Sequence, residues 1–475
     1  MSVILLANVG LRDVCHLGQS VDPARAGGEV LLKDFPNTGR DLTIPMLLPM
    51  VEYVLENHPK LLVILYGTDQ PVDTPASERN RDTLHLAGIA KRILDTQLSG
   101  RACQAQVRLI HGRNPYMYDE MLIHFREQLG RPDIPLAVGD CCYVGVTGGI
   151  PAANTGLMLA AIERAGKDCR VLYLPRGDSR PVQLDIGRQL RDNISKQVLS
   201  EWLRSRGFVE ALRLMKGMDI PRWVTAVVEQ AVARYQFDFE SAWRILEEVA
   251  IPSSADSPGA RDACRRLAND LPDLRSGELS ALMQECYYNA DMAFARGEYA
   301  SFLGVCFRFQ ESLLRCMVEE AYPGISTRVS NRKRDRERWV ESLQNHSGLF
   351  IFLQSEQVNG ERLKWEDCSG RTMEAIVRYT WEGQEVLLGA VRLSQFRSAF
   401  DRLRKLNSLA QLRNKSVIAH DFEGVSEQRI KSTYENSGGN ETPLDDMAGA
   451  LKALGITVRE SPFEMAARLA LTGLD

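Results

Sequence analysis

The stretch V-I-L-L-A-N-V-G-L-R-D-V, Val3 to Val14, decides the fold of the N-terminal part of the chain. A short apolar run, Val3 to Ala7, leads directly into a turn that carries one glycine and a charged pair. An apolar run bounded by a turn is typical of a buried strand. The stretch therefore predicts a first strand followed by a loop at the sheet edge where open α/β folds bind their ligands.

Four further runs of this kind follow, and helical patterns separate them. The predicted strands are Leu61 to Tyr66, Val107 to His111, Tyr143 to Val146 and Val171 to Leu174. In the segments 44–56, 79–98, 116–129 and 152–165, apolar residues recur at intervals of three and four, as on one face of a helix. This alternation predicts an α/β domain over residues 1–180, a Rossmann-like doubly wound parallel sheet.

The second part of the chain reads as mainly helical. The segment P-R-G-D-S-R-P after Leu174 breaks the alternation, and helical patterns begin at about Ile186. A long amphipathic pattern from Ala290 to Glu320, interrupted by Gly297, is typical of a helix with a core face. We expect a helical connecting region over 181–290 and an all-α domain over 291–475. Two β-branched and aromatic runs, Leu349 to Leu353 and Ala375 to Trp381, predict a small β insertion within 348–390.

Composition narrows the class of protein. The 475 residues carry 58 Lys plus Arg against 62 Asp plus Glu, so any site for a polyanion must be local. A hydrophobic content of 44% excludes collagen-like and disordered chains, and no apolar run reaches the ~18 residues of a membrane span. The N-terminus shows no signal peptide, so we expect a cytoplasmic protein. The ten cysteines form no C-x-x-C pair, which argues against a metal site or a disulfide framework.

Three predicted loops after strands carry candidate ligand-binding residues. The loop G-V-T-G-G-I-P-A-A-N, Gly145 to Asn154, opens a helix, and its backbone N–H groups favour a phosphate. We expect the loops to form one nucleotide-binding crevice, although a set of tight turns is the alternative. The absence of G-x-G-x-x-G argues against a dinucleotide oxidoreductase. Asp69 is the one residue that still favours this alternative. The candidates are Asn8, Gly10, Leu11, Arg12, Asp13, Gly67, Thr68, Asp69, Thr147, Gly148, Gly149 and Asn154.

The stretch L-R-N-K-S-V-I-A-H-D-F, Leu412 to Phe422, carries candidate catalytic residues. On a continuous α-helix, Arg413 and His420 would emerge on the same face two turns apart, with Asn414 beside them. A guanidinium can hold a phosphate with two hydrogen bonds, and an imidazole titrates near neutral pH. These residue types suit metal-independent RNA cleavage with the 2'-OH as nucleophile. A solvated arginine and a helix-terminal histidine without a catalytic role are an equally weighted alternative.

The combination of motifs resembles the CARF-HEPN ribonucleases of type III CRISPR systems. The resemblance rests on N-V-G-L-R-D, on the T-G-G loop and on R-N-x-x-x-x-x-H-D-F, with F-R-F-Q-E (Phe307 to Glu311) and F-V-E-A-L-R-L-M (Phe208 to Met215) as further similar segments. It implies an N-terminal CARF domain and a helical HEPN domain. Arg413, Asn414 and His420 match the family's HEPN motif, which implies that they are catalytic. Where the family's glycine loop often continues with T-K or S-K, this chain has Ile150 and Pro151, so a lysine contact to the activator is not implied.

The resemblance implies a homodimer in which the CARF domains bind a cyclic oligoadenylate and the HEPN domains form a composite site that cleaves single-stranded RNA. Two-fold symmetry favours an even ring, cyclic tetra- or hexa-adenylate, because each contact is presented twice. We therefore expect an allosterically activated endoribonuclease of antiviral defence without a resident cofactor. The alternative is a non-catalytic cyclic-nucleotide sensor whose helical domain is an interaction module.

Overall fold

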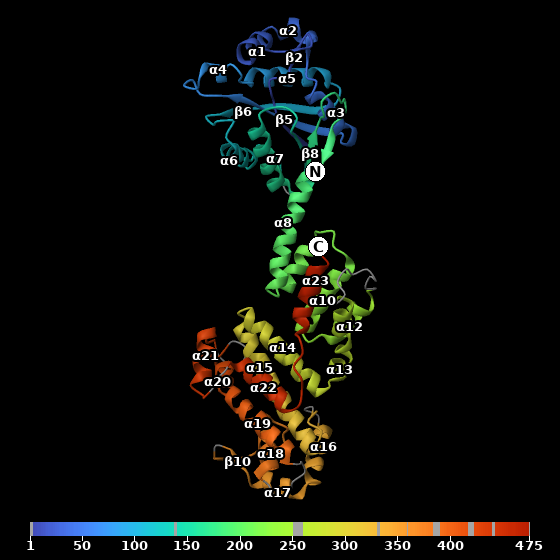
Figure 1. The fold of residues 1–475 in the computed structure, drawn as a ribbon, viewed down its shortest axis with the longest axis vertical. Helices are drawn as coiled ribbons and strands as arrows, with labels where there is room; N and C mark the ends of the chain where they lie inside the picture. The colour runs from blue at the N-terminus through green and yellow to red at the C-terminus, as the bar shows by residue number, and fades with distance from the viewer. Residues whose placement is uncertain are drawn as a thin grey trace. The chain divides into compact units, whose positions relative to one another are not determined.

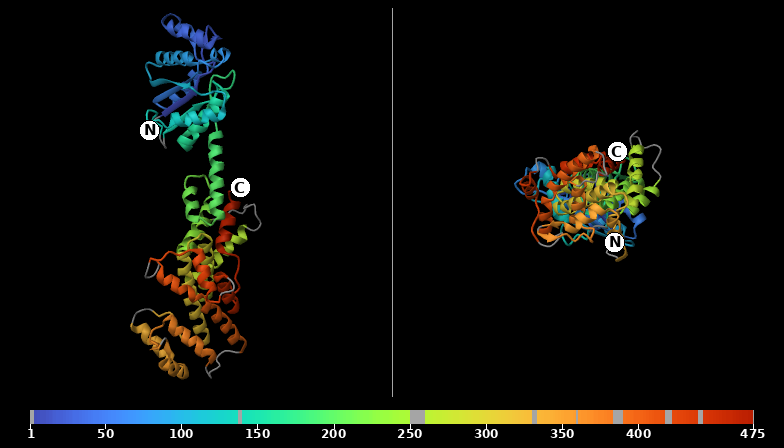
Figure 2. Two further views of the ribbon diagram at one scale, coloured as in Figure 1. Left: turned by 90° about the vertical axis from the view of Figure 1, so that its left-hand side faces the viewer. Right: turned by 90° about the horizontal axis from the view of Figure 1, so that it is seen from below.

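The computed structural model describes residues 3–136, 140–249, 260–329, 333–358, 360–382, 390–416, 422–438 and 442–474. The chain divides into two compact units, Met1–Ser195 and Lys196–Asp475, and the division falls within the long helix α8 (Ile186–Arg204). Figure 2 shows α8 as one uninterrupted green helix. Helical structure begins at Ile186, where the sequence pattern predicts it. The three domain ranges proposed from the sequence stay predictions.

The N-terminal unit is built on a six-stranded sheet in the order β6-β5-β1-β7-β8-β9. Five strands are parallel and β9 runs antiparallel to β8. All five predicted strands are present, whereas β9 was not predicted. The strands are β1 Val3–Asn8, β5 Lys60–Asp69, β6 Ala102–His111, β7 Cys141–Gly145, β8 Cys169–Tyr173 and β9 Val182–Leu184.

The strand order reverses direction between β1 and β7. From β1 the chain winds outward through β5 to β6, then returns to place β7 on the other side of β1. This is the order of a doubly wound Rossmann-like sheet, and it confirms the predicted α/β class. The loops that follow β1 and β7 diverge at this switch point and leave a crevice beyond the carboxyl ends of the strands.

Helices cover both faces of the sheet, as Figure 1 shows for α5 on one side and α6 and α7 on the other. Alternate residues of β1 explain this arrangement, because Leu5 and Ala7 pack with α3 and α5 while Ile4 and Leu6 pack with α6 and α7. The helices are α1 Ala24–Lys33, α3 Leu47–Asn57, α5 Leu84–Gln97, α6 Tyr118–Leu129 and α7 Pro151–Ala165.

Short elements complete the N-terminal unit, and the sequence patterns did not predict them. Cys15–His16 (β2), Gln19–Ser20 (β3) and Leu42–Thr43 (β4) form a small antiparallel sheet. Short helical segments lie at α2 (Phe35–Thr38), η1 (Gly39–Asp41), α4 (Ala76–Arg79) and η2 (Gly166–Asp168). Two-residue strands are too short for a periodic pattern to indicate them.

The C-terminal unit is almost entirely helical in its described residues, as predicted. Its helices are α9 Phe208–Met215, α10 Arg222–Tyr235, α11 Phe239–Glu247, α12 Ala260–Asn269, α13 Leu271–Ser276, α14 Leu279–Ala295, α15 Tyr299–Ala321, α16 Lys333–Gln344, α17 Ser347–Ser355, α18 Gly370–Glu382, α19 Ala390–Leu406, α20 Ser408–Lys415, α21 Glu427–Glu435, α22 Pro443–Ala453 and α23 Pro462–Thr472.

Helix α15 lies at the centre of this unit. The break predicted at Gly297 separates α14 from α15, and the glycine adopts φ +72, a left-handed conformation that lacks steric cost only for glycine. Phe302, Phe309, Leu313 and Met317 are fully buried in the main core of the unit. The predicted apolar stripe is therefore a core face and not a ligand site.

The predicted β insertion is correct only in a reduced form. Leu349 to Leu353 lies in α17 and Ala375 to Trp381 lies in α18, so both runs proposed as strands are helical. The β structure of this region is a hairpin of two-residue strands, β10 (Gln357–Val358) and β11 (Glu361–Arg362). Short apolar runs do not distinguish a strand from a buried helix turn, and packing against the core decided for helix.

No helix in the described part of the chain combines the length and the apolar character that a membrane crossing requires.

Candidate functional site

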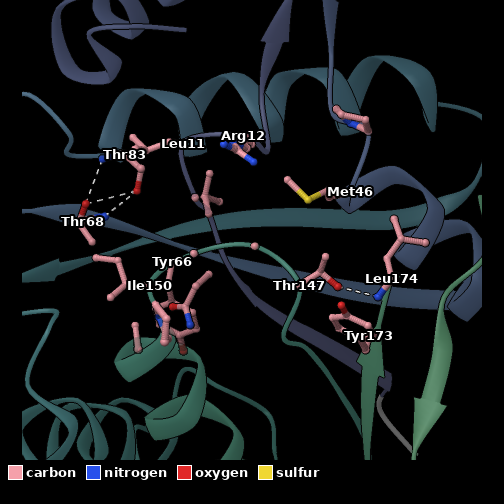
Figure 3. A pocket seen from close by; sticks show the side chains of 18 of the residues that line it. Leu11, Arg12, Met46, Tyr66, Thr68, Thr83, Thr147, Ile150, Tyr173 and Leu174 are labelled. Atoms are coloured by element: carbon pink, nitrogen blue, oxygen red, sulfur yellow. Dashed lines mark hydrogen bonds between the residues drawn. The ribbon is translucent and has the colours of Figure 1, made fainter. Parts of the chain in front are cut away.

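A pocket of about 800 Å³ opens at the switch point of the N-terminal sheet. Figure 3 shows side chains from the loops after β1, β5, β7 and β8 around it. The lining residues are Asn8, Val9, Gly10, Leu11, Arg12, Pro45, Met46, Tyr66, Thr68, Arg81, Thr83, Ile110, Tyr116, Thr147, Gly148, Gly149, Ile150, Pro151, Ala153, Tyr173, Leu174, Pro175, Arg176, Gly177 and Asp178. This size suits a small-molecule ligand.

The two glycine-containing loops pack so closely that larger residues do not fit between them. A Cβ at Gly10 would overlap the backbone nitrogen of Gly149, and a Cβ at Gly148 would overlap the carboxylate of Asp13. Gly149 also adopts φ +87, which other residues rarely take. Ile150, Pro151 and Ala153 at the start of α7 line the pocket, and the N-terminal end of a helix favours an anion.

Two asparagines hold these loops in place. Asn154 on α7 donates from Nδ2 to the carbonyl oxygens of Val146, at 3.1 Å, and Gly148, at 2.5 Å. Its Oδ1 accepts a hydrogen bond of 2.9 Å from Nδ2 of Asn8 at the end of β1. Asn154 therefore connects the loops on both sides of the switch point, although it does not line the pocket itself.

Asp13 lies directly behind the pocket wall. Its Oδ2 accepts a hydrogen bond of 2.5 Å from the backbone N–H of Gly10, and its side chain is fully buried. The other oxygen, Oδ1, has no hydrogen-bond partner among the described residues. Burial raises the pKa of Asp13 to about 7, although the hydrogen bond from Gly10 opposes this rise. A carboxyl group that titrates near neutral pH thus supports the glycine loop.

The carboxyl end of β5 contributes Thr68 to the pocket. The backbone N–H of Thr68 donates to Oγ1 of Thr83, at 3.0 Å, and the N–H of Thr83 donates to Oγ1 of Thr68, also at 3.0 Å. Gly67 packs against the start of α5, and Asp69 forms an ion pair of 2.9 Å with Arg25. Gly67 and Asp69 therefore lie away from the pocket and support its walls.

The structure thus brings together most of the residues proposed from the three loops. Asn8, Gly10, Leu11, Arg12, Thr68, Thr147, Gly148 and Gly149 line the pocket. Asp13, Gly67, Asp69 and Asn154, proposed as ligand contacts, do not line it. The sequence alone did not show which way these residues face, because Gly67 and Asp69 lie in β5, Asn154 lies in α7 and only Asp13 lies in a loop.

Sequence reasoning missed several polar and aromatic residues of the same pocket. Arg81, Arg176, Tyr116 and Tyr173 line it, and no ion pair joins Arg12, Arg81 or Arg176 to a carboxylate in the described ranges. Arg176 lies in P-R-G-D-S-R-P, which follows a strand and carried a signal of the same type as the other loops. Three arginines against the single carboxylate of Asp178 make the pocket suited to an anionic ligand.

The second candidate site lies on α20 in the C-terminal unit. The guanidinium of Arg413 stacks on the ring of Phe307 of α15, with its Cζ 3.9 Å from the ring centroid. Nε and Nη2 of Arg413 donate to Oδ1 of Asn414, at 3.2 Å and 2.6 Å. The ring and the amide together fix the plane of the guanidinium, while Nη1 makes no hydrogen bond among the described residues.

The continuous helix predicted from Arg413 to His420 is wrong. Helix α20 ends at Lys415, where Ser416 turns to an extended conformation and its hydroxyl donates to the carbonyl of Arg413 at 2.7 Å. Ser416 forms an isolated parallel bridge with Glu423. Because α20 ends before Ser416, this helix does not place Arg413 and His420 on one face. His420 lies outside the described residues.

Polar contacts hold α20 against α15. Nε2 of Gln310 donates to Oδ1 of Asn407, the residue before α20, at 3.1 Å, and Gln310 is buried. Because Phe307 and Gln310 are one turn apart on α15, they contact α20 and the residue before it from the same side. The segment F-R-F-Q-E, selected in the sequence for its resemblance, is therefore the support of Arg413.

No cluster of three or more histidine, cysteine, aspartate or glutamate side chains suited to a metal ion occurs among the described residues. The ten cysteines are free thiols.

Comparison with known proteins found a family model that matches part of the C-terminal unit. Residues 274–464 match the family model of the Cas_Csm6 HEPN domain, and this range contains both Phe307 and Arg413. Csm6 of Enterococcus italicus, in a structure described as bound to cyclic hexa-2'-fluoro-hexa-dAMP, matches with a TM-score of 0.57 over 100% of both chains at 13% identity. The chain has the fold of a Csm6-like CARF-HEPN protein. No curated protein matches it in sequence.

We call the pocket at the switch point the CARF-type pocket, after the fold of the N-terminal unit. Arg413 lies within the residues that match the Csm6-type HEPN domain. The fold that the sequence motifs implied is confirmed by the structural match, and residues 274–464 match the HEPN family model.

Proposed function

We propose that the chain is an endoribonuclease of CRISPR-based antiviral defence that cleaves single-stranded RNA when a cyclic oligoadenylate occupies the CARF-type pocket. The observation that carries the proposal is the placement of Arg413 inside the matched Csm6-type HEPN domain, with its guanidinium held face-on to Phe307. An arginine held in this way is already oriented before the substrate binds. Its Nη1 can then donate hydrogen bonds to a phosphate.

The CARF-type pocket has the chemistry that an adenylate ring requires. Arg12, Arg81 and Arg176 would contact phosphates, and the start of α7 would provide N–H donors through the Thr147 to Gly149 loop. Tyr116 and Tyr173 would stack on adenine rings. Since a two-fold dimer presents each contact twice, an even ring, cyclic tetra- or hexa-adenylate, fits a homodimer. The related Csm6 protein with bound cyclic hexa-2'-fluoro-hexa-dAMP supports this ligand class.

In the proposed reaction the 2'-OH of the RNA attacks the adjacent phosphate, and the bond to the 5'-oxygen of the next nucleotide breaks. Arg413 stabilises the negative charge that develops on the phosphate oxygens. The 2'-OH loses a proton and the leaving 5'-oxygen gains one, and His420 transfers a proton to or from these oxygens. Asn414 holds Arg413 through its amide oxygen. The products are a 2',3'-cyclic phosphate and a 5'-hydroxyl. The composite site forms from the HEPN domains of a homodimer, and no resident cofactor takes part in the scheme.

The experiment that tests the proposal measures cleavage of a labelled single-stranded RNA with and without cyclic tetra- or hexa-adenylate, in the presence of a chelator. Activator-dependent cleavage that persists in the chelator and leaves a 2',3'-cyclic phosphate is the expected result. Activator binding without any RNA cleavage would support the alternative, a non-catalytic sensor with an interaction module.

Gly148→Val is expected to raise the activator concentration for half-maximal cleavage by about 10- to 100-fold, which corresponds to about 1.4 to 2.7 kcal/mol of binding. The reason is that a side chain at this position would overlap the Asp13 carboxylate and displace the loop that faces the ligand. The maximal rate should change far less, because Arg413 lies in the other unit. A titration of cleavage rate against cyclic hexa-adenylate measures both quantities.

The matched control for this variant is Gly100→Val, since nothing lies within 4 Å of a Cβ built at Gly100. Its activation curve should superimpose on that of the wild-type protein. An unchanged curve for Gly148→Val as well would place the activator elsewhere.

Phe307→Leu is expected to lower kcat by about 3- to 30-fold with little effect on KM, because it removes the aromatic face that orients the guanidinium of Arg413 while keeping an apolar side chain. Phe307→Tyr retains the ring and should restore most of the rate. Steady-state cleavage kinetics at saturating activator separate the two constants. Equal rates for the leucine and tyrosine variants would show that the ring does not position Arg413.

A further inference from the structure

The C-terminal unit contains a second cavity, away from Arg413, that the proposed reaction does not use. It has a volume of about 380 Å³ and lies between α18 and α19, which Figure 1 shows in the lower, orange part of the chain. This volume falls within the range of small-ligand sites.

The cavity combines aromatic and cationic side chains. Trp381 of α18 and Phe400 of α19 line it and contact each other edge to face, with ring centroids 4.8 Å apart. Phe400 is buried, whereas Trp381 is partly exposed. A partly exposed tryptophan that lines a cavity offers a surface on which a planar, aromatic ligand can stack.

Arginines line both helices at a regular spacing. Arg371 and Arg378 of α18 are seven residues apart, as are Arg397 and Arg404 of α19. A spacing of seven places each pair on one face of its helix, about 10 Å apart along the axis. Two rows of arginine therefore run along the cavity.

Most of this positive charge is free to meet a ligand. Arg378 pairs with Glu356 and lies 3.8 Å from Glu382. In the ranges that the structure describes, no ion pair joins Arg371, Arg397 or Arg404 to a carboxylate. Exposed arginines without such pairs are the residues by which proteins hold phosphate groups.

The carboxylates of the cavity limit the class of ligand. Glu374, Glu382 and Asp401 also line it, so four arginines exceed the acidic groups by one charge. A ligand that carries only negative charge would be repelled by Glu374 and Asp401. A nucleotide, by contrast, presents a phosphate to the arginines, a flat base to Trp381 and base N–H donors to the carboxylates.

We propose that the cavity between α18 and α19 binds a nucleotide of the single-stranded RNA substrate outside the cleavage site. This inference rests on the proposed ribonuclease function, because it assigns to the same substrate a second point of attachment on the HEPN-type unit. Trp381 stacks on a base, and Arg397 and Arg404 contact the phosphates on either side of it. Arg404 lies close to the end of α19, next to the short link that leads to α20 and Arg413.

The test uses fluorescence anisotropy to measure how tightly the full-length protein binds a fluorescein-labelled 2'-O-methyl RNA. The RNA has about 20 nucleotides, which is long enough to occupy a single-strand site of ordinary size. The 2'-O-methyl group removes the proposed nucleophile, so the RNA stays intact. Trp381→Leu should weaken binding by about 5- to 100-fold through loss of stacking. Arg397→Ala and Arg404→Ala should each reduce the slope of log Kd against log salt by about 0.7, the amount for one phosphate contact.

Arg213→Ala is the matched control, since Arg213 is an exposed arginine on α9 outside the cavity. It should leave both the affinity and the salt slope unchanged. Wild-type affinity and slope in all three cavity variants, in a protein that still cleaves unmodified RNA, would overturn the assignment of the cavity. Absence of RNA cleavage by the wild-type protein would instead refute the ribonuclease function, so the two failures are distinguishable.

Discussion

Arg413→Ala is expected to lower RNA cleavage by about 10²- to 10³-fold at saturating activator, the loss that follows removal of one preorganised group at a developing negative charge. The side chain is held by Phe307 and Asn414 rather than buried in the core, so its removal should leave the fold intact. His420→Ala should have an effect of at least the same size, because it removes the proton donor or acceptor. Initial rates on a labelled single-stranded RNA measure both variants.

Two further variants make the result specific. Arg413→Lys keeps the charge but loses the planar fork, and its rate should lie between those of the wild-type and alanine proteins. Arg213→Ala removes an exposed arginine remote in the sequence and should cleave at the wild-type rate. Binding of cyclic hexa-adenylate, measured by calorimetry, should be unchanged in the Arg413 variants. A rate for Arg413→Ala near that of the wild type would remove Arg413 from the catalytic site.

Asp13→Asn is expected to change how the stability of the N-terminal unit depends on pH. Burial raises the pKa of Asp13 from 3.8 to about 7 in the folded protein. Between these two values the folded state keeps a proton that the unfolded state has released, so the free energy of unfolding falls as pH rises and becomes level above about pH 7. At about 1.4 kcal/mol for each pH unit, the loss is about 4 kcal/mol.

The asparagine variant lacks this titration and should gain up to about 4 kcal/mol relative to the wild type between about pH 4 and about pH 8. All six tryptophans lie in the C-terminal unit, so hydrogen exchange of peptides from β1 and β7 is the suitable measurement. Asp73→Asn, which removes an exposed carboxyl group, is the control and should follow the wild type. A difference between Asp13→Asn and wild type that stays constant with pH would contradict this account.

The sequence predicted the α/β part of the fold in detail because its elements bury continuous faces. The run Val3 to Ala7 is apolar on both sides, as a strand covered by helices on both faces must be, and β1 occupies that position. β9 and the two-residue strands β2, β3 and β4 escaped prediction, since their pairing depends on neighbours in space. The runs of α17 and α18 were misassigned for the same reason, because apolar residues alone do not specify a period.

In the candidate sites, too, some features were predicted from the sequence and others depended on the tertiary structure. The sequence indicated the loops that line the CARF-type pocket, since glycine after a strand is a local signal. The catalytic role of Arg413 stays a prediction. The sequence did not indicate that Asp13, Gly67, Asp69 and Asn154 would support the pocket wall rather than line it, nor that α20 would end at Lys415.

What the sequence by itself determined is therefore the order of the elements, the class of each unit and the residue types available for chemistry. The tertiary structure alone decided which of these residues meet. It placed Arg176 and Arg12 in the lining of one pocket and the ring of Phe307 against the guanidinium of Arg413, although more than 100 residues separate the members of each pair in the chain. The physical reason is that periodicity records only which face of an element is buried, whereas the contact between two side chains depends on packing between distant elements.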